Sequence, residues 1–432
     1  MAGLILILQL HTQHTFYQIL YLKLLAMLRL RLYIMMFFQY LMYAVWWVPL
    51  AAYLTNMDVG STQKALILSS MAIGCIASPV IGMLADRYFA GQKVMFVLNI
   101  LNSLFLFWAA STNNPNLLFV LLLFTMLFYM PTWGLTSAIA MAHSASEDFP
   151  KVRVFGSIGW VASGIFSVVV VKIFHLSFDG TNLPFYFGAG TGIVAALLNL
   201  TLPDTPPAGK GKKGSIIDAF GLGTLQLMKE RNFALFIIFS FLSMIPFAMY
   251  YSYFSEFLLN IKIQYITVTM NWGVLAEMGF MLLIPLAIKK FGLRKVVIMG
   301  LIALVVRYVS LYFGGVLEQQ WLFYLGILVH GLIFGFFYVG GQIYIDKKTP
   351  NELKSQGQGF IFLVTFGLGL LAGNMICGKI ISLFNNNSTG ARIYDWNSIW
   401  GITSLASIAL LITFIALFKD DVAEKGMGGS YL

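Results

Sequence analysis

The sequence predicts an all-α integral membrane protein with twelve transmembrane helices in two pseudo-symmetric six-helix halves. The prediction rests on composition, on twelve long apolar runs and on an internal repeat. Of the 432 residues, 59% are hydrophobic and only 10% are charged, which is too few charged side chains to cover a water-soluble protein of this length. A net charge of +10 in a soluble protein would suggest nucleic acid. Here most Lys and Arg residues lie in short loops, so we expect a lipid bilayer and no nucleic acid as partner.

The apolar runs are each long enough to cross a bilayer, which takes about 20 helical residues. Six precede the longest polar interval, at 32–54, 64–85, 94–111, 116–141, 153–174 and 183–203. Six follow it, at 233–259, 267–288, 296–316, 321–345, 355–383 and 397–418. The connections are short, so consecutive helices are expected to cross the membrane and return. No strand pattern competes with this assignment.

The polar interval 204–232 divides the chain. Pro206 and Pro207 favour an extended start, and Ser215–Lys229 could form a short surface helix. The expected organisation is an N-terminal extension (1–27), a first half (28–203), a cytoplasmic linker (204–232), a second half (233–418) and a cytoplasmic tail (419–432). Residues 1–27 are interpreted as an upstream extension, with a natural start near Met27, because no small-residue cleavage site precedes the first span.

The distribution of positive charge predicts the orientation in the membrane. If both termini and the linker share one side, that side holds 21 of the 27 Lys and Arg residues. The other side holds five, and Arg307 lies inside a span; the five are Lys64, Lys172, Lys262, Lys379 and Arg392. Because basic loops stay in the cytoplasm, both termini and the linker are expected there.

The two halves share similar segments at a constant spacing. GMLADRYFAGQKV (82–94) corresponds to IPLAIKKFGLRKV (284–296), and KVRVFGSIG (151–159) to LKSQGQGFI (353–361), both at an offset of 202 residues. Parallel repeats of this kind build secondary transporters, in which the substrate site lies between two halves that rock.

The segment that contains Gly82, Asp86, Arg87 and Lys93 resembles the signature loop of the major facilitator superfamily, between its second and third helices. The resemblance implies a cytoplasmic gate in which the acidic and basic side chains latch helix ends during alternating access. An ordinary charged loop is the alternative.

Nearly the whole chain after about Leu28 resembles the nucleoside:proton symporter family. The matching stretches include FFQYLMYAVWWVPLAAYL (37–54), ASPVIGMLADRY (77–88), FYMPTWGL (128–135), DFPKVRVFGSIGW (148–160), FGFFYVGGQIYIDK (334–347) and QGQGF (356–360). The resemblance implies that Arg153, Ser157 and Trp160 line the nucleoside cavity. Their i, i+4, i+7 spacing puts them on one helical face, and an indole with polar neighbours suits a base and a ribose. The alternative assigns Arg153 to a loop and Trp160 to an interfacial belt.

Only two acidic residues fall inside the predicted spans, Glu256 near an end and Glu277 near the middle. A buried carboxylate in a membrane is costly, so it is a functional candidate. Glu277 matches a family carboxylate in the binding cavity. Arg307 is a possible partner for it, and a purely structural ion pair is the alternative.

The chain departs from the family pattern in the tenth span. The family has an Asp associated with proton coupling in F-D-F-F, where this chain has Gly335 after a retained Phe334. Ala248 and Val274 stand where the family has amides, and Tyr251 where it has Asn. Glu277 and His330 are therefore the candidates for proton coupling, although a lone His is commonly a packing residue. Further candidate cavity residues are Gln39, Tyr43, Tyr251 and Gln342.

The expected function is proton-coupled import of nucleosides by alternating access, as a monomer in the bacterial inner membrane. The partners would be a nucleoside-like small molecule, protons and the lipid bilayer. One alternative is another small polar solute, such as a modified nucleoside or a sugar derivative, without coupling or with another ion. The other is an integral membrane transferase, but no acidic cluster or nucleophile–base motif stands out. No enzymatic activity, cofactor or metal is expected, and Cys75 and Cys377 lie in apolar runs as packing residues.

Overall fold

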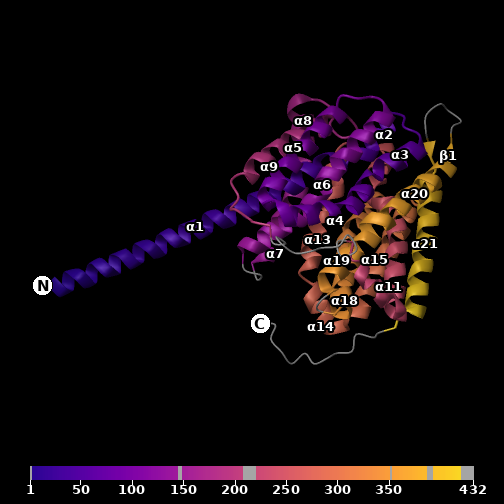
Figure 1. Ribbon diagram of the computed structural model, residues 1–432. Coiled ribbons are helices and arrows are strands. Elements are labelled where there is room, and N and C mark those ends of the chain that lie inside the picture. Colours follow the sequence, from indigo (N-terminus) through magenta and orange to yellow (C-terminus); the bar gives the residue numbers. More distant parts are fainter. Residues whose placement is uncertain (1, 145–147, 208–219, 351–352, 387–392, 420–432) are drawn as a thin grey trace.

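The computed structural model describes residues 2–144, 148–207, 220–350, 353–386 and 393–419, and most of them are helical (Figure 1). The first half consists of α1 (Ala2–Trp47), α2 (Leu50–Asn56), α3 (Ser61–Leu68), α4 (Ser70–Tyr88), α5 (Gly91–Ala109), α6 (Pro115–His143), α7 (Phe149–Ala162), α8 (Gly164–Phe174) and α9 (Leu183–Asn199).

The second half follows a 3₁₀ helix of the linker, η1 (Leu222–Lys229). It consists of α11 (Arg231–Tyr251), α12 (Phe254–Asn260), α13 (Ile266–Met281), α14 (Ile284–Phe291), α15 (Leu293–Val316), α16 (Gln320–Leu328), α17 (His330–Leu332), η2 (Ile333–Val339), α18 (Gly340–Lys348), α19 (Lys354–Phe362), η4 (Leu363–Gly369), α20 (Leu370–Leu383) and α21 (Trp396–Leu417). The segments η2 and η4 are π-helical.

These helices occupy the places of all twelve predicted spans. Ten of the described helices, some broken only by a short kink, are long and apolar enough to cross a membrane. The pair α13 and α14 forms one more span with a bend of 54°, and α9 is a shorter apolar helix of 17 residues. The first span is interrupted at Pro49, which has no N–H for helical bonding. The predicted fold class is confirmed.

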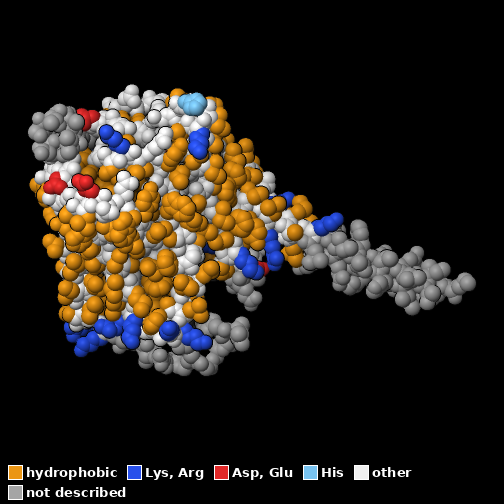
Figure 2. All heavy atoms as spheres, turned by 180° about the vertical axis from the view of Figure 1, so that it is seen from behind, with side chains coloured by type: hydrophobic (Ala, Val, Ile, Leu, Met, Phe, Trp, Pro, Cys, Tyr) orange, Lys and Arg blue, Asp and Glu red, His pale blue; other side chains and the backbone are white. Residues whose placement is uncertain are grey.

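The surface of the bundle suits a bilayer. Figure 2 shows a broad hydrophobic band between a row of Lys and Arg side chains at one end and a more polar end opposite. Large apolar side chains on this surface are strongly exposed, among them Leu405 at 67% and Ile412 at 62%. Apolar exposure on this scale marks contact with lipid. We call the end with the linker and residues 88–91 the linker end, and the end with residues 57–60 and 175–182 the far end.

Several details differ from the sequence-based expectation. The N-terminal extension continues α1 as one helix, whose first part protrudes from the bundle (Figure 1). Asn385–Asn386 and Ile393–Tyr394 form a two-residue antiparallel hairpin that was not predicted. The first part of the helix expected at Ser215–Lys229, up to residue 219, lies outside the described residues, and the described remainder is a turn followed by the 3₁₀ helix η1. Nearly all of the expected tail also lies outside them.

Candidate functional site

The two halves meet in the middle of the bundle where α7 and α8 pack against α13. The span is broken at Ser163, so the carbonyl groups around it lack some intrahelical partners. Asn271 on α13 fills this role: its Nδ2 donates to the carbonyls of Trp160 (3.4 Å) and Val161 (3.1 Å) and to Ser163 Oγ (3.3 Å). This contact fixes the depth of α7 relative to α13.

The same contact brings Arg153 and Glu277 to a similar depth. The helices α7 and α13 are antiparallel, and each residue lies about 10 Å from the Asn271 contact toward the linker end, at a helical rise of 1.5 Å per residue. Arg153 is close enough for its charge to interact with the Glu277 carboxylate in the other half. The structure thus places a cation and a carboxylate on opposite sides of the interface.

The predicted face of α7 is present. Arg153, Ser157 and Trp160 are all half-buried, and the Arg153 guanidinium lies over the Tyr40 ring at 4.4 Å. Close approach of α1 explains this geometry: a Cβ added at Gly159 would lie 2.1 Å from a backbone oxygen of α1. Only glycine permits that approach.

Aromatic rings from both halves meet next to this face. Trp160 packs against Tyr43 at 5.5 Å, within the first half. Two ring contacts cross the interface and are described by their centroid distances: Trp47 to Tyr251 at 6.0 Å and Trp133 to Phe362 at 6.4 Å. We call these six residues the aromatic layer: Tyr43, Trp47, Trp133, Trp160, Tyr251 and Phe362. Flat rings of this kind can stack on a planar ligand.

Glu277 and His330 lie together in the second half. Glu277 is 8% exposed, and its Oε2 is 3.7 Å from His330 Nε2. The helices touch here because Gly331 has no side chain; a Cβ there would lie 2.6 Å from the Glu277 backbone. The pairing that we considered between Arg307 and Glu277 is not found among the described residues. Arg307 instead donates from Nε to the Gly326 carbonyl at 3.0 Å.

Phe334 and Gly335 lie in the π-helical segment η2, and π-helical turns are frequent at functional sites. The half-buried Phe334 ring is 6.2 Å from the His330 ring and 5.9 Å from Tyr338. A Cβ at Gly335 would meet Ile284 at 3.4 Å, an ordinary contact. The backbone therefore leaves space for a side chain where the resembling family has Asp.

Gln39 is placed differently from the other candidates. It is 1% exposed, and its amide pairs with Asn99 (Nε2 to Oδ1 at 3.2 Å, Nδ2 to Oε1 at 2.9 Å) and donates to Thr132 Oγ1 at 2.6 Å. These bonds occupy both ends of the amide within the first half. Gln39 therefore holds helices of the first half together in this conformation.

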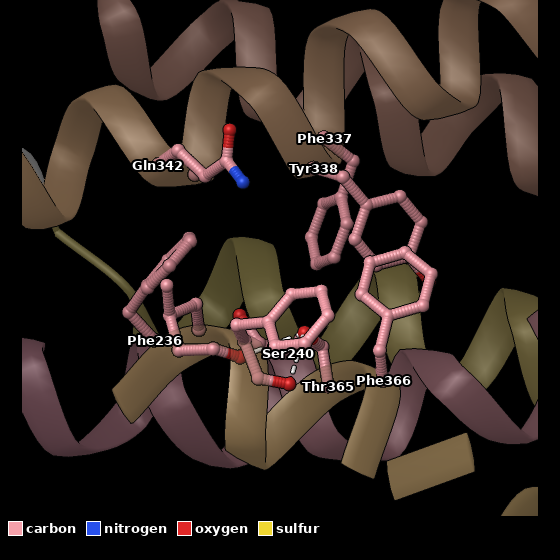
Figure 3. A pocket seen from close by; sticks show the side chains of 10 residues that line it. Phe236, Ser240, Phe337, Tyr338, Gln342, Thr365 and Phe366 are labelled. Carbon is pink, nitrogen blue, oxygen red and sulfur yellow. Dashed lines mark hydrogen bonds between the residues drawn. The ribbon is translucent and has the colours of Figure 1, made fainter. Parts of the chain in front are cut away.

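A pocket opens on the linker side of the aromatic layer, within the second half (Figure 3). The exposed Gln342 points into it from α18, opposite Ser240 of α11 and Thr365 of η4. Phe236, Phe337, Tyr338 and Phe366 form its apolar walls. The pocket offers an amide and two hydroxyl groups beside aromatic rings.

The predicted gate residues lie at the linker end. Gly82 and Arg87 are in the last turns of α4, and Lys93 is exposed in the first turn of α5. The Asp86 side chain lies outside what the structure describes. A Cβ added at Gly82 would meet nothing within 4 Å, so this part of α4 has open space beside it.

Sequence reasoning missed Trp47, Trp133, Phe362 and Asn271. The three aromatic residues carry no signal of their own in a chain with 38 Phe, 9 Trp and 20 Tyr. Asn271 could have been found, because a polar amide in the middle of an apolar run needs a hydrogen-bonding partner.

Residues 26–423 match the profile of a family described as "Nucleoside H+ symporter". A protein of Escherichia coli K12 named as a nucleoside transporter, YegT, is 33% identical over 91% of this chain and 94% of its own length. The xanthosine permease of the same organism is 25% identical over 90% of this chain and 96% of its own.

Among solved structures, the crystal structure of an aspartate-to-alanine variant of the nucleoside transporter NupG matches with a TM-score of 0.84. It is 25% identical, and the match covers 91% of this chain and 100% of that chain. The fold is that of the major facilitator superfamily. The family match spans most of the sequence and agrees with the structural match, and the chain therefore belongs to the nucleoside H+ symporter family.

Proposed function

We propose that this protein is a secondary active transporter that imports nucleosides together with protons by alternating access, and that it acts as a monomer. The observation that carries the proposal is the aromatic layer at the interface between the halves, with Arg153 and Glu277 on opposite sides beside it. A nucleoside combines a flat base with a ribose that needs polar partners, and both are available here.

In this proposal Trp160 and Phe334 stack on the base, as half-buried rings from the two halves. Arg153, Ser157 and Tyr251 bind the hydroxyl groups of the sugar or the polar edge of the base. A substrate that engages the Arg153 guanidinium draws positive charge away from Glu277. That change favours protonation of the carboxylate, so substrate and proton bind together.

The proton carrier is Glu277, with His330 as the group that exchanges the proton with it. Their 3.7 Å separation is short enough for transfer through a small movement or one water molecule. Gly335 stands where the family pattern has an acid, so no carboxylate is supplied from that position.

The described conformation corresponds to an inward-facing state. The hydrogen bonds and ion pairs between described residues of the two halves lie in the middle or at the far end. With the basic linker end in the cytoplasm of a bacterial inner membrane, as charge placement favours, the site faces the cell interior.

A second candidate is import of another small polar solute. It is supported by Gly335, Ala248 and Val274, which remove polar groups that the family pattern has at these places. A related solute with fewer hydrogen-bonding groups would fit the altered set.

Uptake of a panel of radiolabelled nucleosides into proteoliposomes, with and without an imposed pH gradient, tests the proposal. We expect at least one nucleoside to accumulate only with the acidic side outside. If no nucleoside is taken up while a modified nucleoside or sugar derivative is, the second candidate replaces the first.

A further inference from the structure

Two acidic residues join the halves at the far end, one contributed by each half. Glu256 on α12 of the second half accepts a hydrogen bond from Thr55 Oγ1 at 2.8 Å and forms an ion pair with Lys64 on α3 of the first half. Both charged side chains are almost completely buried, at 0% and 1% exposure. Lys64, predicted at the outer start of the span 64–85, thus lies inside the bundle.

Asp179 makes the reciprocal contact from the first half. Its carboxylate accepts from the backbone N–H of Thr267 at 3.2 Å and from Thr267 Oγ1 at 2.5 Å, in the first turn of α13. Ser167 Oγ holds it in place at 2.9 Å. An anion at a helix N-terminus also interacts favourably with the helix dipole. Loss of hydration raises the pKa of Asp179 above its usual range, although these hydrogen bonds lower it.

We propose that these two contacts, Glu256 with Lys64 and Asp179 with Thr267, form the outer gate that holds the far end closed, and that both break when the site opens to the outside. The inference rests on the proposed alternating access. Both contacts cross the interface between the halves, so a rocking motion that parts the far end must separate the partners. Opening also hydrates both charges of the buried pair, which offsets much of the lost attraction.

The buried ion pair predicts different effects for single and double variants. Removing only Lys64 leaves the Glu256 carboxylate buried without its cation, which penalises the closed state and favours opening. Removing both charges leaves no lone buried ion, and apolar or neutral replacements of a buried pair are often tolerated. The double variant should therefore close better than the single variant. If these side chains only filled space, the double variant would open more readily than the single variant.

A cysteine at Ala65 can report the opening. Ala65 is 1% exposed, and a Cβ at Gly378 of the other half would lie 2.8 Å from its Cβ. Ala65→Cys is introduced after Cys75 and Cys377, which are buried, are replaced by Ala. Labelling with a membrane-impermeant maleimide from the outside is followed in intact cells. Gel filtration of the purified variants confirms that each one folds.

Lys64→Met should speed labelling by about tenfold or more. The reason is that an unpaired buried charge destabilises the closed state by more free energy than a tenfold change in an equilibrium constant requires. Glu256→Gln should act in the same direction, and Lys64→Met combined with Glu256→Gln should label more slowly than Lys64→Met alone. Asp179→Ala should also speed labelling. Asp395→Asn is the matched control: it removes a negative charge at the same end, from a carboxylate whose described bonds go to Ser398 of its own half.

Unchanged labelling in a folded Lys64→Met variant, or a double variant that labels faster than both single variants, would overturn the gate. The measurement needs no substrate. Failure of nucleoside uptake with the expected labelling pattern would contradict only the proposed function. Nucleoside uptake together with labelling rates that do not change in the variants would contradict only the gate.

Discussion

Replacing Glu277 by Gln should separate substrate movement from proton coupling. Glu277 is 8% exposed and lies near His330 and Arg153. Gln keeps the size and one carbonyl oxygen but cannot carry a proton. The other acidic residue within the spans predicted from the sequence, Glu256, is held by Lys64. The structure thus offers one carboxylate at the site, and we expect one proton per nucleoside.

That stoichiometry sets the size of the effect. One pH unit corresponds to about 1.4 kcal/mol per proton, or roughly a tenfold ratio. With one proton per cycle, a gradient of one pH unit supports about tenfold accumulation by the parent protein. The Glu277→Gln variant should reach a ratio of about one, because exchange proceeds without the gradient. Counterflow, which needs only exchange, should persist.

The assay is uptake into proteoliposomes with an acidic exterior, together with counterflow in the absence of a gradient. Glu318→Gln is the matched control, because Glu318 is an exposed acid on a loop at the far end. It should accumulate substrate like the parent. If Glu277→Gln still concentrates substrate about tenfold per pH unit, Glu277 is not the carrier, and His330 or another ion takes its place.

Three further predictions concern Trp160 on α7, Gly335 in η2 and Asp148, which directly precedes α7. Trp160→Ala should raise the KM for nucleosides by about tenfold, since base stacking contributes about 1–3 kcal/mol, whereas Trp160→Phe should keep most of the affinity; equal KM values for the two would contradict stacking. Gly335→Asp should fold, given the space beside Ile284. Combined with Glu277→Gln, it should restore accumulation in the uptake assay. A folded double variant that does not accumulate substrate would show that position 335 cannot replace Glu277. Lys151 and then Arg29 hold the pKa of Asp148 below its usual range. The ion pairs therefore stabilise the fold at neutral pH, and this stabilisation is lost as the pH falls through the lowered pKa. Asp148→Asn should melt at a slightly lower temperature than the parent at pH 7 but at the same temperature in strong acid, and an equal deficit at both pH values would rule out the ionic contribution.

The fold was predictable because its signals are local. Apolar runs of bilayer length and basic loops depend only on nearby residues, and the twelve spans follow from them. The face of Arg153, Ser157 and Trp160 was predictable for the same reason, since helical periodicity alone determines it.

The contacts between helices were not predictable, because they depend on residues far apart in the chain. Gln39 was expected to line the cavity, and the sequence did not show that its amide pairs with Asn99, 60 positions away. Lys64 was counted on the outer side at the start of a predicted span, and the sequence did not show that it pairs with Glu256 across the interface. A polar residue in an apolar run indicates that a partner exists, but the sequence does not identify that partner.

The central claim is that nucleoside and proton move together through one site. Nucleoside is added to proteoliposomes that contain a pH-sensitive dye, with no imposed gradient and with the membrane potential clamped. The account predicts that the interior acidifies on nucleoside addition, in proportion to the nucleoside taken up and only in the presence of Glu277. Nucleoside uptake without any acidification, or equal acidification by the Glu277→Gln variant, would contradict it.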